Sequence, residues 1–180
     1  MTAGITDGFS TDDDEKVISI LKKWKGGPLS DQLFTILAGM IPSSGVATVI
    51  LQRSRDLEIL LLPRPTNDIV WPGMLNLPGK QFRSADFHRR DNNPLNGPLE
   101  RIRSDEIKTK FIGNPKFAGV SLHSDKRGPQ VVLVYLAKIK SSSESVGKWY
   151  PVNRLKDMKD FVQSELKSID VALDFYNSVS

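Results

Sequence analysis

The chain of 180 residues contains no cysteine. Disulfide bonds, thiolate zinc sites, iron–sulfur clusters and a cysteine nucleophile are therefore excluded. There are two histidines, His88 and His123, and neither belongs to a pattern typical of a serine triad or a histidine metal site. Because nothing supports an oxidising compartment, we expect a cytoplasmic protein.

Long apolar runs are also missing. Runs such as residues 59–62 are far shorter than the ~20 residues that a membrane-spanning helix needs. Neither end carries a basic segment followed by an apolar stretch, the pattern of a targeting peptide. We therefore expect no membrane insertion. With 39% apolar and 26% charged residues, the chain is typical of one soluble globular domain with a sizeable core.

The net charge of +4 is local. Residues 80–127 hold 11 basic and 6 acidic side chains, whereas the rest of the chain holds 14 basic and 15 acidic ones. A local excess of this sign favours an anionic ligand. The basic residues alternate with acids and no series of aromatic residues accompanies them, which disfavours nucleic-acid binding.

The N-terminal part divides into two segments. Residues 1–10 are small and polar and are predicted to be disordered. Residues 11–42 are predicted to form two short helices, which begin at the capping residues Thr11 and Ser30 and end at Gly-Pro and Pro signals. The apolar residues of these helices either cap the domain or form a partner interface, such as that of a homodimer.

Residues 43–180 are predicted to form the main domain. Turn signals and apolar patterns indicate strands and few helices, which is typical of an α+β or three-layer α/β/α arrangement with a mixed sheet. The expected elements are a hairpin of 46–51 and 57–62, an extended segment 75–82, a loop 83–97, a helix from Pro98 to about Lys110, strands 117–122 and 131–139, an extended segment 149–152, and a helix 155–176.

The sequence matches neither the P-loop pattern of phosphate-binding proteins nor the nucleophile elbow of serine hydrolases. The segment from Gly73 to Lys80 ends in Gly-Lys, but five residues separate its glycines and Gln81 follows. A P-loop needs four intervening residues and a Ser or Thr that reaches magnesium. The chain also has no Gly-x-Ser-x-Gly elbow. Both nucleotide-binding P-loop and serine-hydrolase functions are therefore excluded.

The informative segments are 71–80, WPGMLNLPGK, and 101–106, RIRSDE. A strand, Leu-Pro-Gly, a loop, and a helix with an arginine and two acids resemble the Nudix family of nucleoside diphosphate hydrolases. The flanking elements agree with that family over most of the chain from Val46 to Tyr176. The resemblance implies a Nudix-like α/β/α sandwich for residues 43–180.

The resemblance also implies a site and a reaction. Gly79, Asp105 and Glu106 would hold Mg²⁺ or Mn²⁺, and Arg101, Asp105 and Glu106 would be the catalytic residues, with Asp86 as the loop acid. Carboxylates on one face of a helix coordinate such hard cations. The reaction would be metal-assisted hydrolysis of a phosphoanhydride bond in a nucleoside diphosphate derivative.

Four further residues are candidates for contact with a nucleotide or another phosphate-bearing small molecule. Lys80 and Arg83 lie within the basic stretch, and Arg64 follows the predicted hairpin. Trp71 is the aromatic candidate. For Arg64 the alternative is a place at the fringe of the sheet, and for Trp71 it is a place in the core or its rim, because large aromatic residues supply much of a domain's buried area.

The sequence departs from the Nudix pattern at several positions. Lys80 replaces the second glycine, Ile102 stands where the first helical glutamate is expected, and Lys108 stands where a glycine normally ends the helix. The loop is also about seven residues longer than the family spacing. A rival register places Thr109 and Lys110 on the acidic pair, and Glu106 is the acid common to both registers.

Two hypotheses of function follow. The resemblance favours a hydrolase that is weak because its box is degenerate and that uses Mg²⁺ or Mn²⁺. The alternative is a non-catalytic module with no cofactor, in which Lys80, Arg83 and Arg101 hold an anionic ligand. The basic residues near the box favour phosphate and disfavour a divalent cation.

Overall fold

The computed structural model describes residues 11–23, 30, 33, 36, 42–140 and 146–179. Two compact units, Met1–Ser30 and Asp31–Ser180, make up the chain. In the first unit, helix α1 (Thr11–Lys23) begins at the predicted capping segment and exposes Val17, Ile18 and Ile20.

Several predictions for the N-terminal part lie outside the described residues. Those for residues 1–10 do so entirely. Of the second predicted helix, the described residues Leu33 and Ile36 are helical. The domain boundary at residue 42 stays a prediction. No helix in the described part of the chain is long and apolar enough to cross a membrane.

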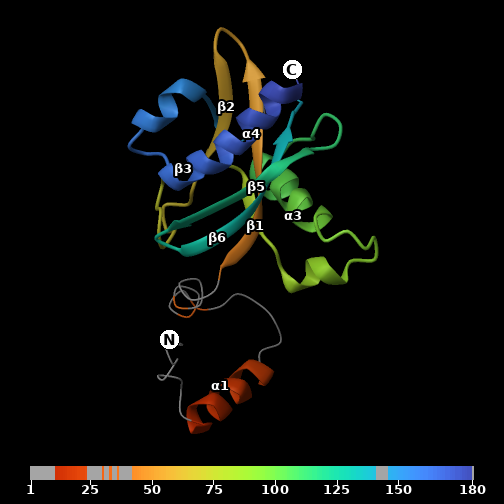
Figure 1. The fold of residues 1–180 in the computed structure, drawn as a ribbon, viewed down its shortest axis with the longest axis vertical. Coiled ribbons are helices and arrows are strands. Elements are labelled where there is room, and N and C mark those ends of the chain that lie inside the picture. The colour runs from red at the N-terminus through yellow and green to blue at the C-terminus, as the bar shows by residue number, and fades with distance from the viewer. Residues whose placement is uncertain are drawn as a thin grey trace, which may run out of the picture. The chain divides into compact units, whose positions relative to one another are not determined.

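The second unit is built on a mixed sheet of seven strands (Figure 1). β1 pairs antiparallel with β2 and parallel with β6, and β6 pairs antiparallel with β5. Three short strands complete the sheet, since β3 and β7 pair with β2 and β4 pairs with β1. The strands are β1 (Ser43–Arg53), β2 (Leu57–Pro63), β3 (Leu75–Asn76), β4 (Gly79–Gln81), β5 (Lys116–Asp125), β6 (Gly128–Ala137) and β7 (Lys148–Pro151). These ranges confirm the predicted hairpin, strands and extended segments.

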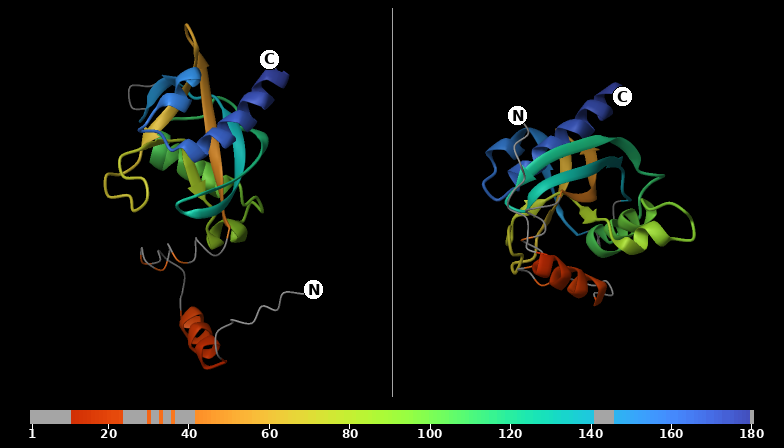
Figure 2. Two further views of the ribbon diagram at one scale, coloured as in Figure 1. Left: turned by 60° about the vertical axis from the view of Figure 1, so that its left-hand side comes forward. Right: turned by 60° about the horizontal axis from the view of Figure 1, so that its bottom comes forward.

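Helices cover both faces of the sheet, so β1 is buried continuously from residue 46 to residue 51. On one face, Val49 packs in a cluster with Ile169 of α4 (Leu166–Val179). On the other face, Ile50 packs against Ile107, the end of the helical segment formed by α3 (Asn96–Arg101) and the π-helical turn Ile102–Ile107. Figures 1 and 2 show α4 and α3 on these two sides. The predicted α/β/α sandwich with a mixed sheet is confirmed.

The central helix differs slightly from its prediction. It begins at Asn96 and ends at Ile107, rather than running from Pro98 to Lys110, and its last turn is π-helical. Lys108 ends it in the left-handed conformation, with φ of 52° and ψ of 31°. This backbone conformation suits glycine, the residue expected there from the Nudix pattern. The predicted loop before this helix contains a 3₁₀ turn, Ser84–His88.

The start predicted for the C-terminal helix is wrong. The segment before α4 forms two short 3₁₀ turns, Val152–Asp157 and Gln163–Glu165. Between them the backbone pairs with β3, because Leu75 donates to the carbonyl of Asp160 (2.7 Å) and accepts from the N–H of Val162 (3.0 Å). Phe161 is completely buried there. A contact with a distant strand therefore overrides the local helical pattern.

Candidate functional site

Strand β4 and the π-helical turn bring Gly79 and Glu106 together. The N–H of Gly79 donates to Oε2 of Glu106 at 2.8 Å. Nζ of Lys80 lies 3.0 Å from Oε1 of the same carboxylate. Burial raises the pKa of Glu106, and the ammonium group of Lys80 opposes that rise. Glu106, the glutamate common to both registers, thus faces the Leu-Pro-Gly loop, but its carboxylate already forms an ion pair with Lys80 of the same chain.

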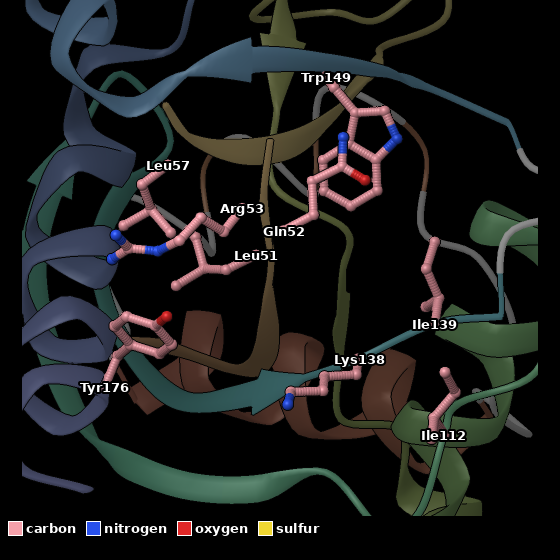
Figure 3. A pocket seen from close by; sticks show the side chains of 9 residues that line it. All are labelled: Leu51, Gln52, Arg53, Leu57, Ile112, Lys138, Ile139, Trp149 and Tyr176. Carbon is pink, nitrogen blue, oxygen red and sulfur yellow. The ribbon is translucent and has the colours of Figure 1, made fainter. Parts of the chain in front are cut away.

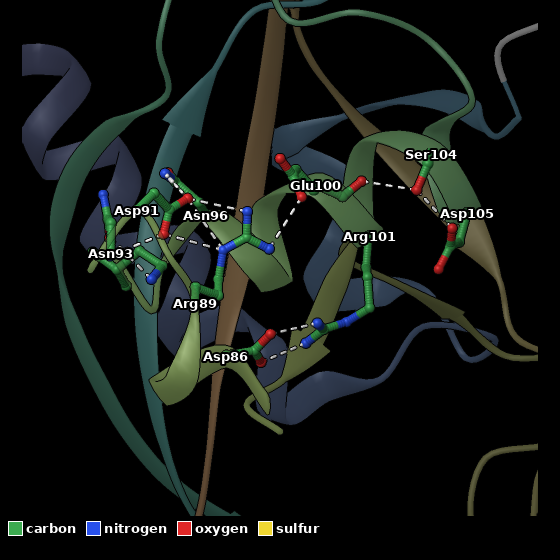
Figure 4. A network of polar contacts seen from close by, with 10 residues as sticks. Asp86, Arg89, Asp91, Asn93, Asn96, Glu100, Arg101, Ser104 and Asp105 are labelled. Carbon is green, nitrogen blue, oxygen red and sulfur yellow. Dashed lines mark hydrogen bonds and ion pairs between the residues drawn. The ribbon is translucent and has the colours of Figure 1, made fainter. Parts of the chain in front are cut away.

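The two other helical positions of the Nudix pattern, Asp105 and Ile102, do not place a carboxylate beside Gly79. Asp105 is exposed, and its Oδ1 accepts a hydrogen bond of 2.6 Å from the hydroxyl of Ser104 (Figure 4). Ile102 is completely buried in a cluster with Val46 and Tyr135. The structure therefore brings Gly79 and Glu106 together and leaves Asp105 at the surface.

Arg101 forms a two-pronged ion pair with Asp86, which is 3% exposed (Figure 4). Its two terminal nitrogens donate to the two carboxylate oxygens at 2.7 and 2.8 Å, and one also donates to the carbonyl of Gln81 at 3.0 Å. These hydrogen bonds from Arg101 are the main cause that lowers the pKa of Asp86. Gly97 leaves the room for this carboxylate, since a Cβ there would lie 1.9 Å from its Oδ1. The pair braces the long loop against α3 and β4.

A second brace holds the outer part of the same loop. Arg89 pairs with Asp91 at 3.1 Å and with Glu100 at 3.3 Å (Figure 4). The candidate Arg83 is exposed and contributes its backbone N–H to Asp86 at 2.8 Å. The ion pair of Arg89 with Glu100 therefore ties the outer part of the loop to α3.

A small pocket of about 80 Å³ opens beside Gly79, at the start of β1. Arg64, Lys80 and Arg127 line it, together with Glu165. Two of the predicted contact residues, Arg64 and Lys80, therefore meet in one pocket, and Arg83 and Trp71 do not line it. Arg127, which the sequence analysis did not single out, adds a third cation.

Two acids orient the guanidinium groups of this pocket. Nε of Arg64 donates to Asp68 at 3.1 Å, and a terminal nitrogen of Arg127 lies 3.3 Å from Asp125. Asp125 also accepts hydrogen bonds from Gln130 (2.9 Å) and from the hydroxyl of Ser164 (3.0 Å). Because several bonds hold each acid, the two arginines are fixed before any ligand binds.

Trp71 lies outside this pocket and stabilises the adjoining loop. Its backbone N–H donates to Oδ1 of Asp68 at 2.8 Å. Nζ of Lys126 lies over its ring, 4.8 Å from the centroid, in a cation–π contact. The lysine covers one face of the ring, and the contact joins the loop to the turn between β5 and β6.

Glu165 is a functional candidate that the sequence analysis missed. It is 9% exposed, and burial raises its pKa to about 7, opposed by Arg127 and Arg64 and reinforced by Asp125 and Glu106. The predicted long helix placed it among ordinary helix residues. Its burial arises from the tertiary contacts around the pocket, so no local pattern in the sequence marks this position.

No family model matches the sequence, and no curated protein matches it significantly. Solved structures do resemble the fold. A MutT protein from Methanosarcina mazei Go1 gives a TM-score of 0.53 at 19% identity, over 77% of this chain and 96% of that one. The NUDIX domain of Shewanella oneidensis NrtR, solved with ADP ribose, gives 0.57 at 14% identity, over 84% of this chain and 100% of that one. A NUDIX hydrolase from Nitrosomonas europaea gives 0.54 at 14% identity, over 77% and 90%.

The chain has the Nudix fold. The Nudix resemblance implies a divalent cation held by Gly79, Asp105 and Glu106. Whether the side chains here could hold such an ion depends on their free oxygen atoms. No group of three or more His, Asp or Glu side chains that could hold a metal exists among the described residues. Both oxygens of Glu106 accept from Gly79 and Lys80, whereas Mg²⁺ requires several free oxygen ligands. The residues present do not fit Mg²⁺ or Mn²⁺.

Proposed function

We propose that this Nudix-fold protein binds a phosphate-bearing nucleotide and does not hydrolyse it. One observation carries the proposal: Nζ of Lys80 lies 3.0 Å from Oε1 of Glu106. A lysine of the chain thus stands where a metal ion would contact this carboxylate. An incoming divalent cation would have to displace the ammonium group and overcome its repulsion.

The pocket beside this ion pair suits a phosphate group. Its three cations, Arg64, Lys80 and Arg127, lie around a volume of about 80 Å³. Since one water occupies about 30 Å³ of liquid, the space fits a single phosphate-sized group rather than a whole nucleotide. Charge-assisted hydrogen bonds from such groups to phosphate oxygens are stronger than neutral ones. That the NUDIX domain of NrtR was solved with ADP ribose supports a nucleotide as the rest of the ligand.

A hydrolase is the second candidate, and Glu165 favours it. This buried carboxyl group lines the same pocket, and its pKa of about 7 suits a general base near neutral pH. Glu106 lies close enough to contribute to that raised pKa. With the observed donor set, turnover at this site would have to proceed without the metal that the Nudix resemblance implies.

Calorimetric titration with ADP-ribose and with inorganic pyrophosphate tests the proposal. We expect binding to persist in EDTA and to weaken at least ~10-fold in Lys80→Ala, the loss of one charge-assisted hydrogen bond. Lys116→Ala is the matched control, because Lys116 is exposed and outside the pocket, and its affinity should equal that of the wild type.

A release assay with Mg²⁺ or Mn²⁺ and a panel of nucleoside diphosphate derivatives decides between the two candidates. Binding without product release supports the binding module. Product release that Glu165→Gln abolishes would overturn it and establish the hydrolase. The predictions of a cytoplasmic location, of a homodimer as one role of the N-terminal helices, and against nucleic-acid binding stay predictions.

A further inference from the structure

A second and larger cavity, of about 350 Å³, lies at the C-terminal end of β1, where Leu51, Gln52 and Arg53 line it (Figure 3). It arises where the sheet splits. The parallel ladder of β1 and β6 ends at the pair Ile50–Ala137, and β1 then continues to Arg53 paired with β2 alone. The two strands diverge from that point, and the cavity opens at this end of the sheet. It shares no lining residue with the pocket of Arg64 and Lys80.

Apolar and aromatic side chains form most of the wall of this split-sheet cavity. Trp149 of β7 and Tyr176 of α4 are half-buried and lie on different sides of β1 (Figure 3). The remaining apolar lining is aliphatic and comes from Leu51, Leu57, Ile112 and Ile139. Such a wall favours a flat apolar body, since aromatic rings supply large contact areas with little conformational freedom to lose.

Gln52 and two cations complete the lining. Arg53 and Lys138 are exposed, and the described residues form no ion pair with either of them. The nearby acid Glu58 accepts hydrogen bonds from Gln52 (2.9 Å) and from Ser54 (3.0 Å). The cavity therefore combines an apolar wall with positive charge that no acid of the described chain neutralises.

We propose that the split-sheet cavity is a second ligand site, which takes a small amphipathic anion. The flat apolar part lies between Trp149 and the aliphatic wall, and the carboxylate or sulfonate group contacts one of the two cations of the lining, Arg53 or Lys138. The volume of about 350 Å³ stands at the lower end of the ~300–1,000 Å³ typical of small-molecule sites. With two cations in an otherwise largely apolar lining, the site suits one anionic group on an apolar body rather than a polyphosphate.

The probe for this site is 8-anilinonaphthalene-1-sulfonate, whose fluorescence rises in apolar surroundings. We expect saturable binding with one molecule per chain, and at least ~10-fold weaker binding in the double variant Arg53→Ala/Lys138→Ala. Arg55→Ala, an exposed arginine of the same hairpin outside the lining, is the control and should bind like the wild type. Inorganic pyrophosphate, which addresses the other pocket, should not displace the probe.

Three results would overturn the proposal. One is equal affinity in the double variant and the wild type. Another is equal affinity for N-phenyl-1-naphthylamine, which lacks the sulfonate. The third is displacement of the probe by pyrophosphate. Trp149→Phe provides a second variant that keeps an aromatic wall, and it should reduce the quenching of tryptophan fluorescence on probe binding while retaining the affinity within a few-fold.

Discussion

Replacement of Gly97 by alanine probes the buried Asp86–Arg101 pair directly. A Cβ on residue 97 would lie 1.9 Å from Oδ1 and 2.7 Å from Cγ of Asp86. The carboxylate would have to leave its place, and with it the hydrogen bonds from Arg101 and from the backbone N–H of Arg83. Breaking a buried ion pair costs about 3–5 kcal/mol.

The expected net loss is somewhat smaller than that. The side chain of Arg101 is 16% exposed, so water replaces part of what it loses, and alanine is favoured over glycine in a helix by ~0.5–1 kcal/mol. We therefore expect the free energy of unfolding to fall by about 2–3 kcal/mol, which urea denaturation would show as a midpoint lower by ~1–2 M. Gly113→Ala is the control, because no atom lies within 4 Å of its new Cβ. Its φ of +69° is then the one source of destabilisation, which we expect to be ~1 kcal/mol.

A double-mutant cycle isolates the cause. In an Asp86→Ala background the nearest remaining atom of residue 86 is its Cβ, 3.3 Å from the new methyl group. Gly97→Ala should then cost little or nothing. The same loss of stability in both backgrounds would refute the idea that Gly97 is required by the carboxylate.

Two further predictions concern Glu165 and Lys108, and a third concerns acid pH. Because burial raises the pKa of Glu165 to about 7, the folded chain keeps a proton that the unfolded chain loses above about 4.5, so stability should fall by about 3 kcal/mol between pH 4.5 and 7. Glu165→Gln should remove this fall in urea midpoints measured at pH 5 and pH 8, and an unchanged difference would contradict the assignment. Lys108→Gly should raise the free energy of unfolding by up to ~1 kcal/mol, since glycine adopts φ of 52° without strain, and a lower melting temperature would speak against it. The lowered pKa of Asp86 gives stability that is present above its ordinary pKa of 3.8 and lost as pH falls further, a loss that Asp86→Asn should not show in acid denaturation.

Local patterns predicted most of the fold. The hairpin of β1 and β2 and the strands β5 and β6 follow from short apolar runs separated by turn residues. The predicted start of the C-terminal helix was wrong because the backbone around Phe161 and Val162 pairs with Leu75, a residue more than 80 positions earlier. Periodicity within a segment carries no information about such a distant partner.

The candidate site shows the same division. The spacing singled out Gly79 and Glu106, and the structure joins them with one hydrogen bond. Asp105 is adjacent in sequence to Glu106, yet it faces solvent, because neighbouring residues of a helical turn point in different directions. The sequence pattern predicted the same role for Asp105 and Glu106, whereas the path of the π-helical turn directs only Glu106 toward Gly79.

By itself, the sequence determined the order of most strands and helices along the chain and the basic character of the central stretch, because each depends on residues close together in the chain. The tertiary structure decided that Lys80 forms an ion pair with Glu106 and that Glu165 is buried beside Arg64 and Arg127. It also decided that the sheet splits and opens a second cavity. Each of these depends on groups from separate strands and loops that meet only when the core has packed. Spacing singled out Lys80 and Glu106 but neither Arg127 nor Glu165, because the burial and charged neighbours of such groups are set only by the packed fold.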